Sequence, residues 1–451
     1  MSNSTYTITA PEAPLNAAIR LPASKSISNR ALILHALAHG TTVPENLSDC
    51  DDTRVMIRAF SPEAKPTTVY QGEELEVIDI MAAGTSMRFL TAYLSVTPGR
   101  RIITGTERMQ NRPIKILVDA LRSLGADIEY IGKEGYPPLL ITGKDVSTSV
   151  QASSDSSSVS ADDPSASSMM TAFGHQLSLP GNVSSQYISA LLMIGAVLPK
   201  GLTLRLTGDI ISRPYINMTL RLMETYGAEA AWTSDKEITV QPTGYQDVPF
   251  CVESDWSAAS YWYEILALGQ EGGEVSLHGL YPRSTQGDSR GAEVFAKLGI
   301  RTAYTDQGVT LTRLGTPVAR LIEDMVDIPD LAQTFTVTCC LMNIPFRFTG
   351  LQSLKIKETD RIHALKEELR KLGYVIHDEA DSILYWNGER CPATEGASIA
   401  TYEDHRMAMA FAPAAEALPA GGIRISEPAV VSKSYPAYWD HLKRAGFTIK
   451  D

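Results

Sequence analysis

One kind of helix recurs along the chain, and a short strand-like segment follows it each time. Its apolar residues recur at i, i+3, i+4 and i+7, which is typical of a helix with one buried face. It ends at a glycine, the residue that most readily adopts the left-handed conformation found just after a helix. The glycines at the ends of five such helices are Gly125, Gly227, Gly299, Gly373 and Gly446. The last four are separated by 72, 74 and 73 residues, which indicates an internal repeat.

A second kind of helix precedes each helix of the first kind. It is rich in Ala, Leu and Met, and it leads into a strand such as Arg101–Gly105. The predicted starts of these helices are Ser26, Gly84, Ser184, Asp255, Asp330 and Asp404. With a degenerate copy at Asp51–Phe60 and Thr67–Tyr70, the pattern predicts six α–β–α–β units.

The six units divide into two lobes of three, because the first three helix starts carry hydroxyls or glycine and the last three carry aspartate. We predict lobe one at residues 22–243 and lobe two at residues 244–451. The strand-like segment Tyr6–Pro11 is expected to return to the second half, so residues 1–21 belong to lobe two. The spacing between the helix starts Gly84 and Ser184 is longer than the other spacings of the repeat, and the Ser-rich stretch Val146–Phe173 accounts for the excess. We expect this stretch to be a mobile surface loop inserted in lobe one.

Composition narrows the class of protein. A chain of 451 residues is too long for one core, and its net charge of -12 argues against a nucleic-acid-binding surface. The longest apolar helical stretch, Ile188–Leu198, is shorter than the roughly 20 residues that cross a bilayer. Met1–Pro14 lacks the charged and apolar regions of a signal peptide. We therefore expect a cytoplasmic protein, a monomer, with no nucleic-acid or membrane partner.

The five cysteines form no CxxC pair, and no cluster of His and Cys has metal-ligand spacing. We therefore expect no metal and no other cofactor.

The predicted helix starts carry residues suited to anions. Lys25 and Arg30 flank the start of the first helix, where Ser24 or Ser26 is a candidate N-cap. Free backbone N–H groups and basic side chains at a helix start bind phosphate or carboxylate. The alternative is a capped surface helix with solvated basic residues. Similar groups recur at Gly84–Arg88, Asn111–Pro113, Ser184–Gln186, Ser212–Tyr215, Asp330, Lys357–Arg361, Asp404–Arg406 and Ser432–Ser434. This collection suits two anionic ligands and a few carboxylates for proton transfer.

Eight motifs taken together resemble the 5-enolpyruvylshikimate-3-phosphate synthase family of enolpyruvyl transferases. They are LPASKSISNRALIL (21–34), AGTSMR (83–88), NRPI (111–114), LPGNVSSQYISALLM (179–193), SRPYI (212–216), IPD (328–330), KETDRI (357–362) and EDHRMAMAF (403–411). The resemblance implies an α/β fold with two lobes, each of three βαβαββ repeats about a pseudo-threefold axis, that close over the substrates. It also implies transfer of the enolpyruvyl group of phosphoenolpyruvate to the 5-hydroxyl of shikimate 3-phosphate, with release of phosphate.

The same resemblance implies the site residues. Shikimate 3-phosphate would be held by Lys25, Ser26, Arg30, Ser184, Ser185, Gln186, Ser212, Tyr215, Asp330, Ser353 and Lys357. Phosphoenolpyruvate would be held by Lys25, Gly84, Arg112, Gln186, Arg361, Arg406 and Lys433. Asp330 would be the base at the 5-hydroxyl, and Glu358 the proton shuttle at the methylene carbon, together with Lys433 or Lys25. Arg30 would bind the shikimate carboxylate through two hydrogen bonds. His405 would either orient the site or be a structural hydrogen-bonding residue.

The chain departs from the family pattern at four positions. Ala82 replaces a usual Asn, Ser86 a common Ala, Phe89 a frequent Pro, and Ser353 an Asn that often helps to hold shikimate 3-phosphate. The replacement of Asn by Ala82 makes this part of the expected phosphoenolpyruvate site less polar. The family's inhibitor glyphosate occupies the place of phosphoenolpyruvate, so we expect competition with that substrate, weakened if Phe89 displaces its helix.

Two other functions are compatible with parts of the pattern. The sister transferase that acts on UDP-N-acetylglucosamine normally has a catalytic Cys in the first lobe. The loop after Arg112 has none, and Cys50 lies in an acidic turn. A catalytically dead anion-binding protein of the same fold is the second alternative. Taken singly, Lys357–Arg361 and Asp404–Arg406 could also be helix starts with a capping box or a salt bridge, and Asp255 and Asp51–Asp52 are predicted N-caps.

Overall fold

The computed structural model describes residues 4–61, 63, 65–144, 176–211, 213–357, 359–418 and 421–451. Ser212, Glu358 and the predicted loop Val146–Phe173 therefore lie outside the described residues. The chain divides into two compact units. The first unit is Lys25–Val252, and the second unit combines Met1–Ser24 with Glu253–Asp451. None of the described helices is long and apolar enough to cross a membrane.

A repeat of six elements builds most of the first unit. In each copy, two strands joined by a helix pair in parallel. A second helix follows, and it leads to two further strands that extend the same sheet by antiparallel pairing. One copy contains β8(Gln176–Pro180), α8(Ser185–Gly195), β9(Leu202–Thr207), α9(Arg213–Thr225), β10(Ala230–Ser234) and β11(Glu237–Val240). The other contains β4(Glu73–Asp79), α3(Gly84–Ser95), β5(Gly99–Thr104), α5(Lys115–Ser123), β6(Asp127–Tyr130) and β7(Leu139–Gly143), with α4(Glu107–Gln110) before α5 and β3(Thr67–Tyr70) at the sheet edge.

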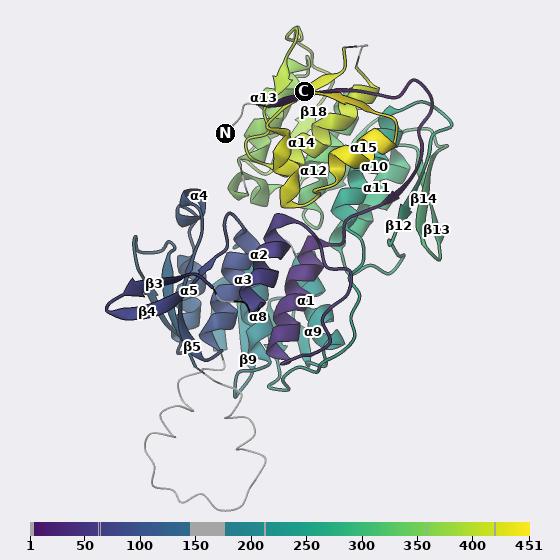
Figure 1. Ribbon diagram of the computed structural model, residues 1–451. Helices are drawn as coiled ribbons and strands as arrows, with labels where there is room; N and C mark the ends of the chain where they lie inside the picture. The colour runs from purple at the N-terminus through teal and green to yellow at the C-terminus, as the bar shows by residue number, and fades with distance from the viewer. Residues whose placement is uncertain are drawn as a thin grey trace, which may run out of the picture. The chain divides into compact units, whose positions relative to one another are not determined.

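The first repeat of this unit is reduced. Its helices are α1(Lys25–Leu37) and α2(Asp51–Phe60). In place of a sheet, the described residues there form an isolated parallel bridge between Glu45 and Cys251. The strand predicted at Thr67–Tyr70 pairs with β4 and so belongs to the next sheet. Helices α1, α3 and α8 pack against one another in the buried centre of the unit, as Figure 1 shows.

The second unit has three sheets in the described residues, and the N-terminal residues complete two of them. β2(Asn16–Arg20) pairs in parallel with β12(Glu274–His278), and β1(Thr5–Thr9) lies between β20(Ile423–Ser426) and β21(Thr448–Lys450). Both chain termini lie in this unit (Figure 1). Its other elements are α10(Trp256–Leu268), η1(Gly287–Arg290), α11(Gly291–Lys297), β13(Ile300–Thr305), β14(Gly308–Arg313), β15(Leu321–Asp324), η2(Pro329–Leu331), α12(Ala332–Leu341), β16(Phe346–Thr349), η3(Gln352–Ile356), α13(Arg361–Lys371), β17(His377–Glu379), β18(Ile383–Trp386), β19(Ser398–Ile399), α14(His405–Phe411), η4(Ala412–Glu416), η5(Pro428–Lys433) and α15(Tyr438–Arg444).

The whole first unit is inserted between β2 and α10 of the second. The two crossing segments pair with each other, because the Ser24 N–H donates to the Glu253 carbonyl at 2.9 Å and the Asp255 N–H donates to the Pro22 carbonyl at 2.9 Å. The predicted α/β class is confirmed. The expected return of the N-terminal segment to the second half is also observed.

The helix ends follow the sequence prediction. The glycines predicted to end helices all have positive φ: Gly125 92°, Gly227 84°, Gly299 91°, Gly373 92° and Gly446 99°. A side chain at these positions would be strained, because L-residues with a Cβ rarely adopt this conformation. These glycines therefore end the helices and turn the chain back toward the sheet.

Several predicted helix starts are confirmed, and others need correction. Ser184, Asp255 and Asp404 each accept a hydrogen bond from a backbone N–H of their own helix. The helix α1 begins at Lys25, so Ser24 stands at the predicted position before it and Ser26 lies within it. The buried Ser24 Oγ has no hydrogen-bond partner among the described residues, so its side chain does not cap the helix. Asp51 and Asp52 lie in the first turn of α2, where Cys50 holds the N-cap position.

Candidate active site

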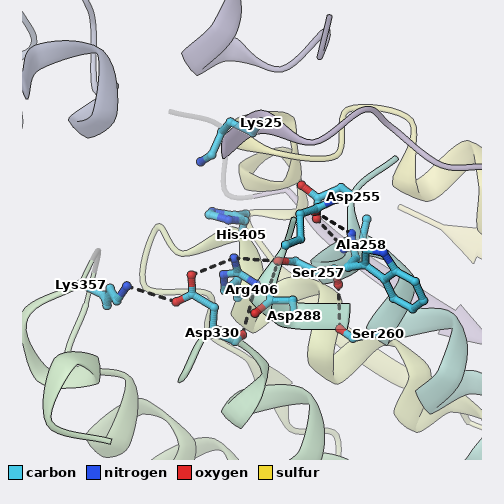
Figure 2. A network of polar contacts seen from close by, with 12 residues as sticks. Lys25, Asp255, Ser257, Ala258, Ser260, Asp288, Asp330, Lys357, His405 and Arg406 are labelled. Atoms are coloured by element: carbon cyan, nitrogen blue, oxygen red, sulfur yellow. Dashed lines mark hydrogen bonds and ion pairs between the residues drawn. The ribbon is translucent and has the colours of Figure 1, made fainter. Parts of the chain in front are cut away.

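Asp330 is the centre of a cluster of basic side chains in the second unit (Figure 2). It lies in η2, in the connection between β15 and α12. Its Oδ1 lies 2.8 Å from Arg361 Nη1 and 3.3 Å from Lys357 Nζ, and its Oδ2 lies 3.2 Å from Arg406 Nη2. Its backbone carbonyl also accepts from Arg406 Nη1 at 3.1 Å. Three cations therefore fix the orientation of one carboxylate.

Asp404 is the second carboxylate of this cluster and is fully buried. Its Oδ2 accepts from Arg361 Nε at 2.7 Å, and its Oδ1 accepts from the Arg406 backbone N–H at 2.9 Å. It thus caps α14 and pairs with the first residue of α13 at the same time. Burial of the Arg361 guanidinium, which is 1 % exposed, is tolerated because carboxylates bind it from two sides.

Ser257 and Asp288 extend the cluster away from Asp330. Arg406 Nη2 donates to Ser257 Oγ at 3.4 Å, and the Ser257 hydroxyl donates to the Asp288 carboxylate (Figure 2). Burial raises the pKa of Asp288 to about 6, although the nearby Arg406 opposes this shift. Sequence reasoning missed both residues, because each is a single polar residue without a periodic or motif signal.

Lys433 and His405 lie beside the same backbone segment. Lys433 ends η5, and its Nζ donates to the Glu403 carbonyl at 2.8 Å. His405 is buried, with Nδ1 3.9 Å from Asp404 Oδ1. We call Lys357, Arg361, Arg406 and Lys433 the basic cluster. Lys357, Arg361 and Arg406 contact Asp330, and Arg361 also contacts Asp404.

Ser353 is in η3 but is 7 % exposed, and its Oγ has no hydrogen-bond partner among the described residues. A ligand would have to reach into the structure to contact it.

Hydrogen bonds join the helix starts of the first unit in the same way. Lys25 Nζ, at the start of α1, lies 3.2 Å from Asp52 Oδ2 at the start of α2. The Asp52 carbonyl accepts from Ser86 Oγ of α3 at 3.0 Å. Thr85 Oγ1 in turn accepts from Gln186 Nε2 of α8 at 3.0 Å. These contacts connect the starts of α1, α2, α3 and α8 within this unit.

Gly84 lets two arginines approach the start of α3. A Cβ at this position would lie 2.7 Å from Arg112 Nη1 and 3.0 Å from Arg88 Nη1. Arg88 donates to the Gly84 carbonyl at 2.9 Å and lies over the ring of Tyr187. The sequence motif contained Arg88, but no role was predicted for it; its position beside Arg112 makes it a further candidate for the anion site.

Arg30 is buried deeper than its predicted role implies. Its Nε donates to Thr219 Oγ1 at 2.7 Å, Nη1 to the Ser26 carbonyl at 2.9 Å, and Nη2 to Ser189 Oγ at 3.0 Å and to the Tyr215 carbonyl at 3.5 Å. Desolvation by burial lowers the pKa of Arg30 to about 10. A bidentate carboxylate contact would require the guanidinium to exchange some of these acceptors for the ligand.

The other predicted residues of the first unit lie at the same helix starts. Ser184 caps α8, Ser185 is its first residue, and Tyr215 lies in the first turn of α9. No group of three or more His, Cys, Asp and Glu side chains able to hold a metal ion occurs in the described part of the chain. What each unit offers is a fixed set of hydroxyls and cations at helix starts, and the second unit adds carboxylates. Such groups bind anions and transfer protons.

Comparisons with known proteins agree with this chemistry. The profile of the family "EPSP synthase (3-phosphoshikimate 1-carboxyvinyltransferase)" matches residues 9–173 and 165–442. A 3-phosphoshikimate 1-carboxyvinyltransferase of Bacteroides fragilis is 61% identical over 445 residues, covering 99% of this chain and 98% of the relative. One of Escherichia coli is 34% identical over 451 residues, covering 96% and 97%.

A solved EPSP synthase structure from Acinetobacter baumannii has the same fold, with a TM-score of 0.74 at 21% sequence identity over 99% of this chain and 100% of that one. The predicted fold class and the predicted family are thus confirmed. Since the family profile and the relatives span nearly the whole sequence, the chain belongs to the EPSP synthase (3-phosphoshikimate 1-carboxyvinyltransferase) family.

Proposed function

We propose that Asp330 is the base and that Arg361, Arg406 and Lys433 of the basic cluster bind phosphoenolpyruvate in the reaction of this transferase. The enzyme moves the enolpyruvyl group of phosphoenolpyruvate to the 5-hydroxyl of shikimate 3-phosphate and releases phosphate. The observation that carries these roles is the set of three cations around Asp330. They orient a carboxylate beside groups that bind anions, as proton transfer next to a phosphorylated substrate requires.

The charges of the second unit suit phosphoenolpyruvate. Arg361 and Arg406 each have five N–H donors and Lys433 has three, and the planar guanidinium groups match carboxylate and phosphate oxygens. In the first unit, Lys25, Gly84, Arg112 and Gln186 complete the proposed set for this substrate, and Arg88 is added to it. Because Gly84 has no side chain, the ligand and both arginines can approach the backbone there.

Shikimate 3-phosphate would be held by hydroxyls and by Lys357. Ser26, Ser184, Ser185, Ser212 and Tyr215 provide hydroxyls for its phosphate and ring oxygens. Arg30, Gln186, Lys25, Asp330 and Ser353 complete the set that the family resemblance implies. In this proposal the two units are the two lobes of the family.

The proposed chemistry needs one acid and one base. Protonation of the methylene carbon of phosphoenolpyruvate makes its neighbouring carbon electrophilic, and the 5-hydroxyl then attacks that carbon while Asp330 takes the hydroxyl proton. Loss of a methyl proton and of phosphate gives the enol ether. Glu358 with Lys433 or Lys25 would carry the proton at the methylene carbon; for Glu358 this role rests on the family resemblance alone.

The experiment is phosphate release from phosphoenolpyruvate, with shikimate 3-phosphate or UDP-N-acetylglucosamine as acceptor. Purified enzyme in EDTA should release phosphate with the first acceptor. Size-exclusion chromatography should give the elution volume of a monomer. Asp330→Asn should lower kcat at least a hundredfold, while Asp327→Asn, an exposed aspartate three residues away, should leave it unchanged. Near-normal turnover of a folded Asp330→Asn variant would disprove the assigned base.

A further inference from the structure

The turn that precedes Asp404 is strained. Tyr402 has φ 53° and Glu403 has φ 55°, so two successive residues with side chains occupy the left-handed region. Such a conformation is unfavourable for a residue with a Cβ and persists only where its surroundings hold it. Something in the second unit must therefore stabilise this turn.

The Asp404 N–H closes the turn by donating to the Thr401 carbonyl at 2.8 Å, and Glu368 of α13 binds the turn from outside. Its side chain is fully buried. Oε1 accepts from the Tyr402 hydroxyl at 2.7 Å, and Oε2 accepts from the Ala400 backbone N–H at 3.0 Å and from Lys371 Nζ at 2.6 Å. Lys371 also donates to the Ser398 carbonyl at 3.1 Å. One buried carboxylate thus binds the segment that leads into the strained turn at two points, and Lys371 binds it at a third.

The strained turn positions the basic cluster. The carbonyl of Glu403 accepts from Lys433 Nζ, and the next residue, Asp404, binds Arg361 and caps the helix that carries Arg406. Three of the four cations of the basic cluster therefore depend on the backbone path through Tyr402 and Glu403. Glu368 lies on the same helix as Arg361, about two turns further along, so α13 supplies both a cation of the site and the clamp on the turn.

We propose that Glu368 is a positioning residue for phosphoenolpyruvate, an inference that rests on the roles proposed above for Arg361, Arg406 and Lys433. It acts through Tyr402 and Ala400 by fixing the turn that aligns these cations, and it does not touch the ligand. Loss of the clamp lets the turn relax to ordinary backbone conformations, so the cations lose their shared alignment. Binding of phosphoenolpyruvate then weakens more than binding of shikimate 3-phosphate.

The test compares Glu368→Gln with Glu367→Gln, its exposed neighbour on the same helix. Glutamine keeps the size of the side chain but loses the charge-assisted bonds. We expect KM for phosphoenolpyruvate to rise about tenfold or more, with KM for shikimate 3-phosphate within about twofold of wild type and no change in the control. An unchanged KM for phosphoenolpyruvate, or an equal rise in both KM values, overturns the inference.

Two more variants separate alignment from folding. Tyr402→Phe removes one hydroxyl and nothing else, so it decides the question even if Glu368→Gln fails to fold: the same selective rise in KM supports the inference, and no rise overturns it. Asparagine tolerates the left-handed conformation better than glutamate. Glu403→Asn added to Glu368→Gln should therefore recover part of the lost affinity.

The failure of this inference and the failure of the proposed roles look different. If Asp330→Asn abolishes turnover while the Glu368 and Tyr402 variants keep both KM values, only the positioning role is wrong. If Arg361→Gln and Arg406→Gln leave KM for phosphoenolpyruvate unchanged, the proposed roles of the basic cluster are wrong, and the positioning role falls with them.

Discussion

Asp288 should make the second unit less stable as the pH rises. Its carboxyl is 6 % exposed, and burial raises its pKa from 3.8 to about 6. The folded protein therefore binds more protons than the unfolded chain between these two values, so the free energy of unfolding falls as pH rises through this window and is level above it. The full shift corresponds to about 3 kcal/mol, of which roughly 1.4 kcal/mol lies between pH 5 and pH 8.

The replacement Asp288→Asn should remove this pH dependence, because an amide resembles the protonated carboxyl and can still accept from the Ser257 hydroxyl. Urea unfolding followed by tryptophan fluorescence reports mainly on the second unit, which contains Trp256, Trp262, Trp386 and Trp439, while the first contains Trp232. Relative to wild type, the variant should gain roughly 1.4 kcal/mol between pH 5 and pH 8. Asp327→Asn, at an exposed aspartate, is the control. A stability difference between Asp288→Asn and wild type that does not change with pH would refute the reasoning.

Three further predictions concern the substrates. Arg406→Gln should raise KM for phosphoenolpyruvate by about tenfold to a hundredfold, since each hydrogen bond to a charged group contributes about 1.5–3 kcal/mol. Steady-state kinetics would measure this change, with Arg390→Gln as the control variant. An unchanged KM for Arg406→Gln would contradict the prediction. Phe89→Leu removes the ring that lies 5.2 Å from the Arg30 guanidinium and should raise KM for shikimate 3-phosphate severalfold, with KM for phosphoenolpyruvate unchanged. Glyphosate should compete with phosphoenolpyruvate but not with shikimate 3-phosphate, and an inhibition pattern independent of phosphoenolpyruvate concentration would exclude a shared site.

The helical repeat could be predicted from the sequence because its signals are local. A C-terminal glycine, an apolar face and a polar start each depend on a few neighbouring residues, and the five glycines all adopt the expected positive φ. The degenerate copy was also predicted, but its strand pairing could not be, because the composition of a strand-like segment does not determine which strand it pairs with. Thr67–Tyr70 has the composition of a strand of the first repeat but pairs with β4 of the next.

The sequence predicted only those candidate site residues that belong to recognisable motifs. Arg361, Arg406 and Asp330 belong to motifs, and the structure brings both arginines within hydrogen-bonding distance of Asp330. Asp288, Ser257 and Glu368 contact the motif residues or the segment that holds them, but lie outside the motifs themselves. Such groups are recognised only after the fold brings residues more than 30 positions apart into contact, as with Glu368 and Tyr402.

Several places where local rules are broken lie near the proposed substrate-binding groups. Arg30 is a buried cation whose pKa is lowered, Asp288 is a buried acid whose pKa is raised, and Tyr402 and Glu403 adopt a conformation that few side chains tolerate. Each of these features lowers stability, and each lies within one or two contacts of a proposed substrate-binding group. Comparable departures also occur away from these groups. Glu264 of α10 is a fully buried acid whose pKa is raised by burial, and Ala380 and Asp381 have φ 51° and 54° in the turn between β17 and β18. A chain selected for stability alone would have replaced residues of both kinds. Such a departure therefore supports the proposed anion site only where cations and hydroxyls gather beside it, as Arg361, Arg406 and Ser257 do near Asp288 and the Tyr402–Glu403 turn.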